Sequence, residues 1–524
     1  MKLTEAAAAA VLPTILVVLL SATVCSNQAQ AQDKPNIAAK GGPPQSAPAG
    51  AWKPTASPLA ANVKAVDKAA VDAALAGKAK PNIVVIMTDN LGYGDLGIYG
   101  GMRAPTPRID QLSREGVRFR DFQVEPACTH TRAAFMSGRM PIRSGNDGFV
   151  TPGGKSGLDP KEVTIAEVLK GAGYGTAMYG KWHLGESQDR LPTTQGFDEW
   201  YGVTNTSIPV DPNFPGYDET WPKQQILQSR AGEEAKSVAE MTLGKRATMD
   251  RELTTKGVAY IKSQAQAKSP FFLLLTYVNP HHPNVPHPDF KGKSGGGAYA
   301  DVLMEIDHNT GTVLDAIDAA GIRDDTIVVW FSDNGPTRYS PEPDHNGHNG
   351  QWSGELGSAW EGGLRTAGMM RWPGKIRGGW VSDEIFHVMD LYTTLGRFGG
   401  GEVPEDRPVD GFDQREYLLG KRDTSARDHC VTFLNNKLTA VRWRQFKAHF
   451  VLYERFAPLQ HGSQDLGVIP RMYNLRADPA ELYDLFGSSG GTPLYFNIQR
   501  AVAPYLKSFA AFPHKDYSMM TRSK

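Results

Sequence analysis

Three short runs of apolar residues constrain the fold of this chain more than any other feature. They cover residues 83–87, 271–275 and 326–331, and each is followed at once by polar residues. Uninterrupted runs of this length are typical of strands buried on both faces, as in parallel sheets. Segments with helical spacing lie between them. This alternation predicts an α/β fold, with a large, mainly parallel sheet flanked by helices.

Two of the intervening segments carry clear helix signals. Thr164 and Glu167 have the spacing of a capping box, and the apolar residues that follow share one helical face. Between residues 303 and 317 apolar side chains recur at helical spacing, and the pattern stops before Gly321. We therefore expect helices in both places.

The pattern changes after about residue 411. Residues 438–443 and 446–452 have the character of an antiparallel pair of strands. A chain of 524 residues has room for several domains at roughly 100–200 residues each. We predict a large α/β domain over residues 80–411 and a smaller C-terminal α+β domain over residues 412–524, built on an antiparallel sheet.

The first 31 residues have the features of a secretory signal peptide. A weakly basic start is followed by an apolar stretch to Val24 and by the small-residue cleavage site at 29–31. A retained membrane anchor and a lipoprotein cysteine at Cys25 are the alternatives. Residues 32–79 have the composition of a Pro/Ala-rich linker and N-terminal extension, with a short helix over 63–75. No later stretch reaches ~18 uninterrupted apolar residues, so we expect a periplasmic or secreted chain without stable membrane insertion after cleavage.

The charge balance and the cysteine count exclude further classes. The chain has 56 basic and 56 acidic residues, so nothing in its net charge attracts nucleic acid. Three cysteines cannot build a disulfide framework. Once a signal peptide is removed only Cys128 and Cys430 remain, and a disulfide between them is one possibility.

Polar residues follow four expected strands, the three apolar runs and residues 174–179, at the point where each strand ends. In a parallel sheet these ends meet at one edge, which is where open α/β sheets bind ligands. A single Asp-Asn pair after a strand is usually a turn or a helix cap, but four such endings favour a site. The oxygen ligands suit Ca²⁺ or Mg²⁺. The residues are Asp89, Asn90, Lys181, His183, His281, Asp333 and Asn334.

A further candidate segment covers residues 126–139. If a helix begins near Cys128, then Arg132, one turn further on, and Arg139, after Ser-Gly, are expected to face the same way as the cysteine. The N-terminus of such a helix would favour an anion. The alternative is a buried structural cysteine or the disulfide to Cys430.

Eight motifs follow one another between residues 81 and 485. They are PNIVVIMTDNLGYGDLGIYGG (81–101), CTHTRAAFMSGR (128–139), GYGTAMYGKWHLG (173–185), NPHHP (279–283), FSDNG (331–335), WEGGLR (360–365), RWPG (371–374) and DPAELYDL (478–485). In this order and at this spacing they resemble the type I sulfatases (arylsulfatases) of the alkaline-phosphatase-like superfamily. The resemblance covers roughly residues 80–485.

The resemblance implies that a formylglycine-generating enzyme converts Cys128 to formylglycine. The hydrated aldehyde carries two hydroxyls on one carbon. One attacks the sulfur of a sulfate ester, and deprotonation of the other then expels sulfate and restores the aldehyde. A serine would have to await attack of water on a hindered anionic ester.

The resemblance also implies the roles of the other candidates. Ca²⁺, with Mg²⁺ as the second possibility, would be bound by Asp89, Asn90, Asp333 and Asn334 together with residue 128. Arg132 would stabilise the nucleophile, and Lys181 would contact the sulfate. His183 would be the base of the elimination step, and His281 would assist the leaving group.

The chain departs from the family pattern at three positions. His130 stands where the family usually has Pro or Ala, Asn90 stands where it usually has Asp, and Leu356 aligns with a sulfate-binding lysine. An Asn carbonyl is still a competent Ca²⁺ ligand. The candidates to replace the missing cation are His345, His348 and Arg365.

These features predict hydrolysis of small-molecule or glycan sulfate esters. The loops over residues 205–244 and 337–352 are expected to set the substrate. Hydrolysis of phosphate or phosphonate monoesters on the same scaffold is one alternative, because both groups are tetrahedral anions. A degenerate, non-catalytic sulfate-binding homologue is the other, because of His130 and Leu356.

Overall fold

The computed structural model describes residues 80–206, 210, 220–337, 346–456, 458 and 461–513, which belong to one compact unit. The expected signal peptide, linker and short helix before residue 80 lie outside the described residues. Within the described ranges, no helix combines the length and the apolar character that crossing a bilayer requires.

The main sheet is mixed but mostly parallel, as predicted. Its strand order is β10-β2-β9-β8-β1-β7-β3-β4-β5-β6, with β11 paired to β2. Strand β9 is antiparallel to both of its neighbours, and the β4-β5-β6 end is antiparallel as well. The strands are β1 (Asn82–Thr88), β2 (Val117–Gln123), β3 (Gly175–Lys181), β4 (Glu199–Val203), β5 (Gln225–Arg230), β6 (Lys236–Glu240), β7 (Phe271–Thr276), β8 (Thr326–Ser332), β9 (Arg365–Arg371), β10 (Trp380–Ser382) and β11 (Phe386–His387).

The expected strands that end in polar residues form the centre of this sheet, in the order β8-β1-β7-β3. All three pairings among them are parallel, so their carboxyl ends share one edge. Val84 of β1 pairs with Leu273 on one side and with Val328 on the other. Every residue of β1, β7 and β8 is buried, which explains why their sequences are continuously apolar.

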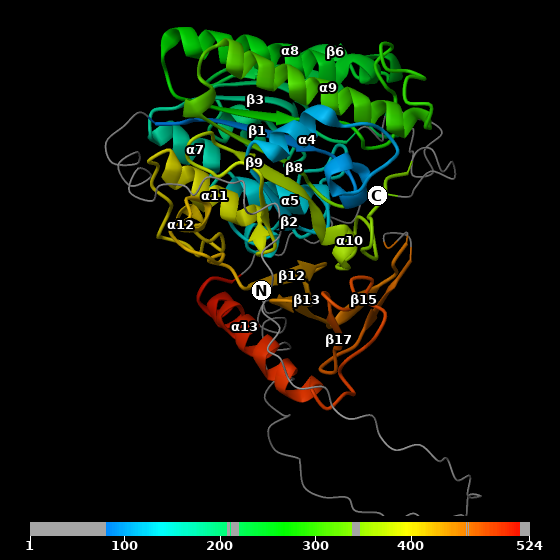
Figure 1. Ribbon diagram of the computed structural model, residues 1–524. Helices are drawn as coiled ribbons and strands as arrows, with labels where there is room; N and C mark the ends of the chain where they lie inside the picture. The colour runs from blue at the N-terminus through cyan, green and yellow to red at the C-terminus, as the bar shows by residue number, and fades with distance from the viewer. Residues whose placement is uncertain are drawn as a thin grey trace, which may run out of the picture. The chain divides into compact units, whose positions relative to one another are not determined.

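Successive side chains of β1 enter two different cores. Val84 and Ile86 pack in the core that contains α8 (Leu243–Ala267) and α9 (Gly297–Ala319). Ile83 and Val85 pack in the core that contains α5 (Cys128–Ser137), α7 (Ile165–Gly171) and α11 (Val388–Phe398). The helices therefore cover both faces of the sheet (Figure 1). The smaller helices are α4 (Pro107–Arg114), α6 (Pro141–Ser144), α10 (Glu361–Leu364) and α12 (Arg415–Leu418).

Both predicted helices are present. Before α7, the Thr164 hydroxyl accepts the Glu167 amide at 3.1 Å, and the Glu167 carboxylate accepts the Thr164 amide at 2.7 Å. This is the expected capping box. The segment around residues 303–317 lies within α9.

The C-terminal region contains a four-stranded antiparallel sheet, in the order β12 (His429–Leu434), β13 (Lys437–Trp443), β14 (Phe446–His449) and β17 (Arg471–Asn474). The predicted pairing of β13 with β14 is confirmed. The predicted second strand ends earlier, because the chain leaves β14 at His449 and forms β15 (Val451–Tyr453), which pairs with β16 (Ser463–Asp465). Helix α13 (Gly491–Ala511) completes the region. The boundary at residues 411/412 stays a prediction.

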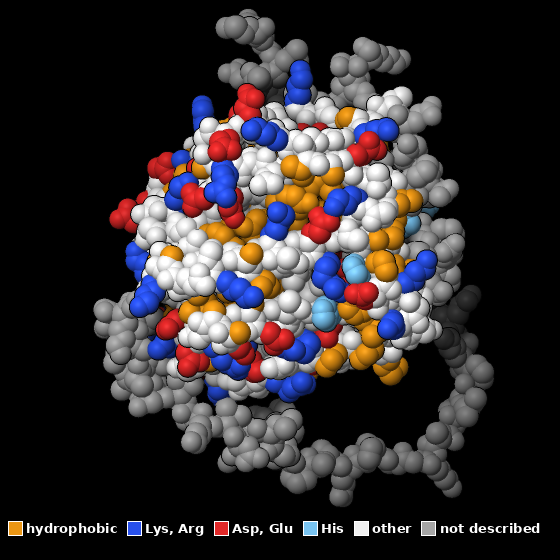
Figure 2. Space-filling model, turned by 90° about the horizontal axis from the view of Figure 1, so that it is seen from above, with side chains coloured by type: hydrophobic (Ala, Val, Ile, Leu, Met, Phe, Trp, Pro, Cys, Tyr) orange, Lys and Arg blue, Asp and Glu red, His pale blue; other side chains and the backbone are white. Residues whose placement is uncertain are grey.

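The surface agrees with a net charge of zero. Figure 2 shows acidic and basic side chains interspersed on the face seen from above, where the described residues gather no large area of one sign. On this face, electrostatic attraction of a charged ligand would have to come from local groups of side chains.

Candidate active site

The two Asp-Asn pairs meet at the carboxyl edge of the central strands. Thr88 and Ser332 are partners in the β1–β8 register, so the residues that follow them emerge side by side. The Asn90 amide donates to Asp333 Oδ1 at 3.1 Å, and Asn334 Nδ2 donates to Asn90 Oδ1 at 2.6 Å. Adjacent parallel strands thus place both pairs in one buried cluster.

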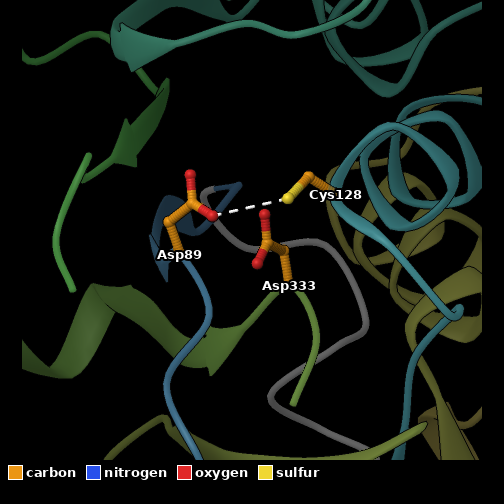
Figure 3. A group of neighbouring side chains, drawn as sticks. All are labelled: Asp89, Cys128 and Asp333. Atoms are coloured by element: carbon orange, nitrogen blue, oxygen red, sulfur yellow. Dashed lines mark hydrogen bonds between the residues drawn. The ribbon is translucent and has the colours of Figure 1, made fainter. Parts of the chain in front are cut away.

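Cys128 enters this cluster as the first residue of α5. Its Sγ lies 3.5 Å from Asp89 Oδ1 and 3.6 Å from Asn90 Oδ1. One possible ligand atom from each of Asp89, Cys128 and Asp333 lies within 4.8 Å of the others, and the three side chains point toward one another (Figure 3). Ligands of one Ca²⁺ at ~2.3–2.6 Å can be up to about 5 Å apart, so a single ion fits.

The amide side chains support an oxygen-ligated cation. Asn334 Oδ1 is buried and accepts no hydrogen bond within the described part of the chain. A buried acceptor without a donor is unusual in a native protein and indicates a missing partner. Together with the carboxylates of Asp89 and Asp333, this oxygen suits a hard divalent cation such as Ca²⁺ or Mg²⁺.

Arg132 and Lys181 bring two positive charges to the cluster, and both are buried. Arg132 lies one helical turn after Cys128 and donates from Nε and a terminal nitrogen to Asp333 Oδ2 at 3.0 and 2.8 Å. Lys181 Nζ donates to Asp89 Oδ2 at 2.6 Å. Arg132 also donates to the Lys181 carbonyl at 2.6 Å, which ties α5 to the end of β3.

The ionisation of the acidic groups reflects burial and these charges. Burial raises the pKa of Asp89, but Lys181, then His281 and Arg132, outweigh it and hold that pKa below its usual range. Burial and the Asp89 carboxylate raise the pKa of Asp333 to about 6. Burial, followed by the carboxylates of Asp333 and Asp89, raises the pKa of the Cys128 thiol well above its ordinary value.

The two candidate histidines lie in the segments that follow two of the central strands, His183 after β3 and His281 after β7. Burial, then the charges of Lys181 and Arg132, lower the pKa of His183 well below its ordinary value. Its Nε2 lies 3.1 Å from the Val150 carbonyl. Burial lowers the pKa of His281 to about 3, with Lys181 acting in the same direction and Asp89 against it. Both rings are therefore neutral in the structure as it stands.

The hydrogen bonds of His281 define its tautomer. Its Nδ1 lies 2.6 Å from the His282 carbonyl, which can only accept, so Nδ1 carries the proton. Its Nε2 lies 2.7 Å from the Thr206 hydroxyl, which donates to it when the ring is neutral. Thr206 gave no signal in the sequence, because a lone threonine after a strand is too common to single out.

The three departures from the family pattern have different surroundings. Asn90 lies in the cluster. His130 is buried in α5, with Nε2 3.6 Å from Asp147 Oδ1 and its ring edge-on to Phe149. Leu356 packs against Ala127 and Cys128 in a small apolar group, which Phe149 extends. One wall beside Cys128 is therefore apolar.

Neither of the two suggested replacements that the structure describes, Arg365 and His348, lies in the cluster. Arg365 is buried and pairs with Glu361 at 2.7 Å. His348 is exposed, and its Nδ1 accepts the Gly350 amide at 3.0 Å. His345 lies outside the described residues. Arg139 does not join Cys128 and Arg132 either, because left-handed Gly138 ends α5 and Arg139 pairs with Glu162 at 2.7 Å.

Cys128 and Cys430 are both free and buried, so the alternative of a disulfide between them is wrong for this structure. Cys430 lies in β12. Burial raises its pKa to about 12, which makes it an inert core residue.

The chain is similar to known sulfatases in sequence and in fold. A sequence model of the sulfatase family matches residues 81–400. Human arylsulfatase A is 34% identical over 457 residues, covering 81% of this chain and 87% of that protein. The N-acetylgalactosamine-6-sulfatase of Canis lupus familiaris is 31% identical over 463 residues, covering 82% and 85%. The crystal structure of the PsFucS1 sulfatase from Pseudoalteromonas sp. aligns with a TM-score of 0.77 and 29% identity, covering 86% of this chain and 95% of that one.

Proposed function

The chain belongs to the sulfatase family and is a sulfuric ester hydrolase, and on this premise we propose that it acts through a formylglycine made from Cys128 beside a bound Ca²⁺. The observation that carries the proposal is the buried convergence of Asp89, Cys128 and Asp333 within 4.8 Å. Mg²⁺ is the second candidate for the ion.

The aldehyde would be made by a formylglycine-generating enzyme. The thiol sulfur would leave as hydrogen sulfide, one atom of dioxygen would become the aldehyde oxygen, and the other would be reduced to water with two further electrons from an external thiol. Once hydrated, the group supplies a hydroxyl nucleophile at the N-terminus of α5. Asp89, Asn90, Asp333 and Asn334 would hold the cation, which lowers the pKa of that hydroxyl and binds a sulfate oxygen.

Lys181 and Arg132 would bind and orient the anionic ester. Lys181 already donates to Asp89 at 2.6 Å, and a cation between the carboxylates would leave more of its three donors for sulfate. Arg132 is held by Asp333 and by the Lys181 carbonyl, so its guanidinium is fixed before the substrate arrives. Fixed donors of this kind stabilise developing charge without reorganisation.

The histidines would divide the proton transfers. His281, whose Nδ1 proton is held by the His282 carbonyl, would take up a second proton at Nε2 when the anionic ester binds and would pass it to the departing oxygen. His183 would serve as the base that removes a proton from residue 128 when sulfate is released. A positioned acid or base contributes ~10²–10⁴-fold to rate.

The substrate would be a small-molecule or glycan sulfate ester. The relatives include one named for arylsulfatase activity and one named for a sugar sulfate, so both classes are candidates. The apolar group of Leu356 and Phe149 beside Cys128 would contact the substrate near the sulfur. The expected signal peptide would deliver the enzyme to the periplasm or outside the cell, where such esters are met.

Two measurements test the proposal. In protein made by its native host, the peptide with Cys128 should be about 18 Da lighter than its sequence predicts, because an aldehyde replaces the thiol. The purified enzyme should hydrolyse aryl sulfate faster than aryl phosphate. An unmodified thiol in active enzyme, or a preference for phosphate, would contradict the proposal and favour the phosphomonoesterase alternative.

A further inference from the structure

Helix α8 reaches the loop that carries His281 with two charged side chains. Arg246 and Asp250 lie one helical turn apart, so they project from the same face of the helix. Both have no exposed surface. Charged residues are almost never fully buried unless their charges are used, so these two call for an explanation.

Their hydrogen bonds go to the backbone of that loop. One Arg246 nitrogen donates to the Val278 carbonyl at 2.9 Å and to the His281 carbonyl at 2.8 Å. Asp250 accepts the Val278 amide at 2.9 Å and the Asn279 amide at 3.1 Å. The two side chains therefore hold the loop through both its donors and its acceptors.

The same loop also holds the backbone of a proposed metal ligand. The Asn279 carbonyl accepts the Asp89 amide at 3.1 Å. Asn279 is thus bound by Asp250 on one side and by Asp89 on the other. A shift of the loop would change the position of His281 relative to Asp89, which is the geometry on which proton transfer depends.

We propose that Arg246 and Asp250 are positioning residues that set the place of His281 in the active site. The inference rests on the proposed role of His281 in assisting the leaving group. A stable core alone does not require the pair, because well-packed apolar residues usually stabilise a protein as well as buried charges do. Their specific contribution is to fix the backbone of Val278 and Asn279 before His281 and the carbonyl of His281 itself.

The test is a double-mutant cycle between α8 and His281. Arg246→Met should lower kcat/KM for phenyl sulfate about 10²-fold and for 4-nitrophenyl sulfate much less, because a good leaving group needs little proton transfer. In a His281→Ala background the same substitution should change kcat/KM less than about twofold, because its effect acts through the missing ring. Arg246→Lys, which keeps a donor, should recover part of the loss.

Two further variants control for folding and charge. Asp250→Asn keeps the side-chain volume and should reproduce the leaving-group dependence if Arg246→Met does not fold. Arg251→Met removes a positive charge from the half-buried side of the same helix and should leave both substrates unaffected. Amide hydrogen exchange of the peptide over residues 277–284 should accelerate at least tenfold in Arg246→Met and stay unchanged in Arg251→Met.

The outcomes separate this inference from the proposed function. Multiplicative losses in the double mutant, equal losses with both substrates, or unchanged exchange in Arg246→Met would each overturn the positioning role. If the native enzyme did not hydrolyse aryl sulfates, or if His281→Ala showed no leaving-group dependence, the proposed function would fail first. The exchange experiment would still decide whether the two side chains hold the loop.

Discussion

Two buried clusters of charge in this molecule differ in how completely their groups are paired. The first is the proposed active site around Asp89, Cys128 and Asp333. The second, which we call the sheet junction, consists of Asp121, Glu361, Arg442 and Lys447, where the main sheet meets the four-stranded sheet. Glu361 accepts Lys447 Nζ at 2.9 Å and lies 3.4 Å from Arg442, and both oxygens of Asp121 accept from Arg442. In the active site, by contrast, Asn90 Nδ2 and Asn334 Oδ1 have no partner among the described residues.

The pKa values of the carboxylates differ between the two clusters in the same sense. Burial raises the pKa of Glu361, but Lys447, Arg365 and Arg442 outweigh it and hold that pKa well below its ordinary value. In the active site, burial and Asp89 raise the pKa of Asp333 to about 6, although Arg132 lies 2.8 Å away. In the sheet junction every charged group has a partner of opposite charge. The active site is incomplete, which suits it to receive a cation and an anionic substrate.

The largest expected effect on activity comes from removing the proposed nucleophile of the first cluster. Cys128→Ala should abolish sulfate ester turnover while far-UV circular dichroism and the thermal midpoint stay close to those of the native protein, because one small side chain carries the covalent step. Cys128→Ser should be nearly as inactive. Cys430→Ala is the matched control, since it removes the other buried cysteine, and it should retain activity. Native-like turnover in Cys128→Ala would disprove the assignment.

Asp333→Asn tests whether the charges of the proposed active site serve activity more than they serve the stability of the fold. We expect activity to fall about 10³-fold, because the variant loses a charge that binds the cation. The stability of the metal-free protein should change by less than about 1 kcal/mol, because losing the Arg132 bonds is offset by relief of repulsion from Asp89. Added Ca²⁺ should raise the thermal midpoint of the native protein and not that of the variant. Equal Ca²⁺ stabilisation of both proteins would exclude Asp333 as a ligand.

Lys447→Met should give the opposite result in the sheet junction. Breaking a buried, paired charge costs about 3 kcal/mol, because Glu361 is left partly uncompensated. Activity per folded molecule should stay within about twofold, since Lys447 does not contact the active-site cluster. Lys437→Met removes a lysine from an exposed ion pair and should cost less than about 1 kcal/mol. Urea unfolding of both variants measures the two losses of unfolding free energy. Equal losses would contradict a larger contribution from the buried lysine of the sheet junction than from the exposed one.

His281→Ala probes the active site without changing its charge. We expect kcat/KM to fall about 10²-fold for phenyl sulfate and less than about tenfold for 4-nitrophenyl sulfate, because only the poorer leaving group needs a proton. His183→Ala should leave kcat/KM for both esters largely intact and lower kcat, because its proposed step follows the departure of the leaving group, and intact-protein mass should show a trapped covalent sulfate. The neighbouring His282→Ala is the control. A larger leaving-group effect in His282→Ala would exchange the roles of the two histidines.

The smallest expected effect is on the pH dependence of stability, and it comes from Glu305 of α9. Like the amides of the proposed active site, this buried acid has a polar atom without a partner among the described residues. Its Oε2 accepts the His287 amide at 2.9 Å, and its Oε1 has no partner in the described ranges. Burial and then Asp250 raise its pKa from 4.5 to about 8. The native state therefore binds this proton more tightly than the unfolded chain, so its stabilising contribution is complete below pH 4.5 and is lost as pH rises toward 8. Glu305→Gln should reduce the loss of stability between these limits by at least about 1 kcal/mol, measured by urea unfolding, and an unchanged pH dependence would argue against a protonated Glu305.

Local patterns predicted the central part of the fold and of the site. The apolar runs of β1 and β8 identified buried parallel strands, and the position of Asp89 and Asp333 directly after them placed both at one edge. The capping box before α7 needs only four consecutive residues, so it too was readable. These features depend on neighbours in sequence.

Features that depend on tertiary contacts could not be predicted from the sequence. An arginine and an aspartate four residues apart, such as Arg246 and Asp250, have the same spacing on a solvent-exposed helix. Lys447 and Glu361 are 86 positions apart and meet only because two sheets pack together. The position of Arg139 was predicted wrongly because the left-handed Gly138 turns the chain away after the last residue of α5.

The contact of Leu356 with Cys128 has a consequence for the order of events during synthesis. In the folded chain only 3% of Cys128 is exposed, so a modifying enzyme has little access to its thiol. Leu356 leaves the ribosome about 230 residues after Cys128, and at ~5–20 residues per second this leaves roughly 10–50 s in which the cysteine is uncovered. The proposed conversion of Cys128 would therefore have to be complete before Leu356 packs against it. Slower translation between the two positions would raise the yield of active enzyme without changing a single contact in the finished protein.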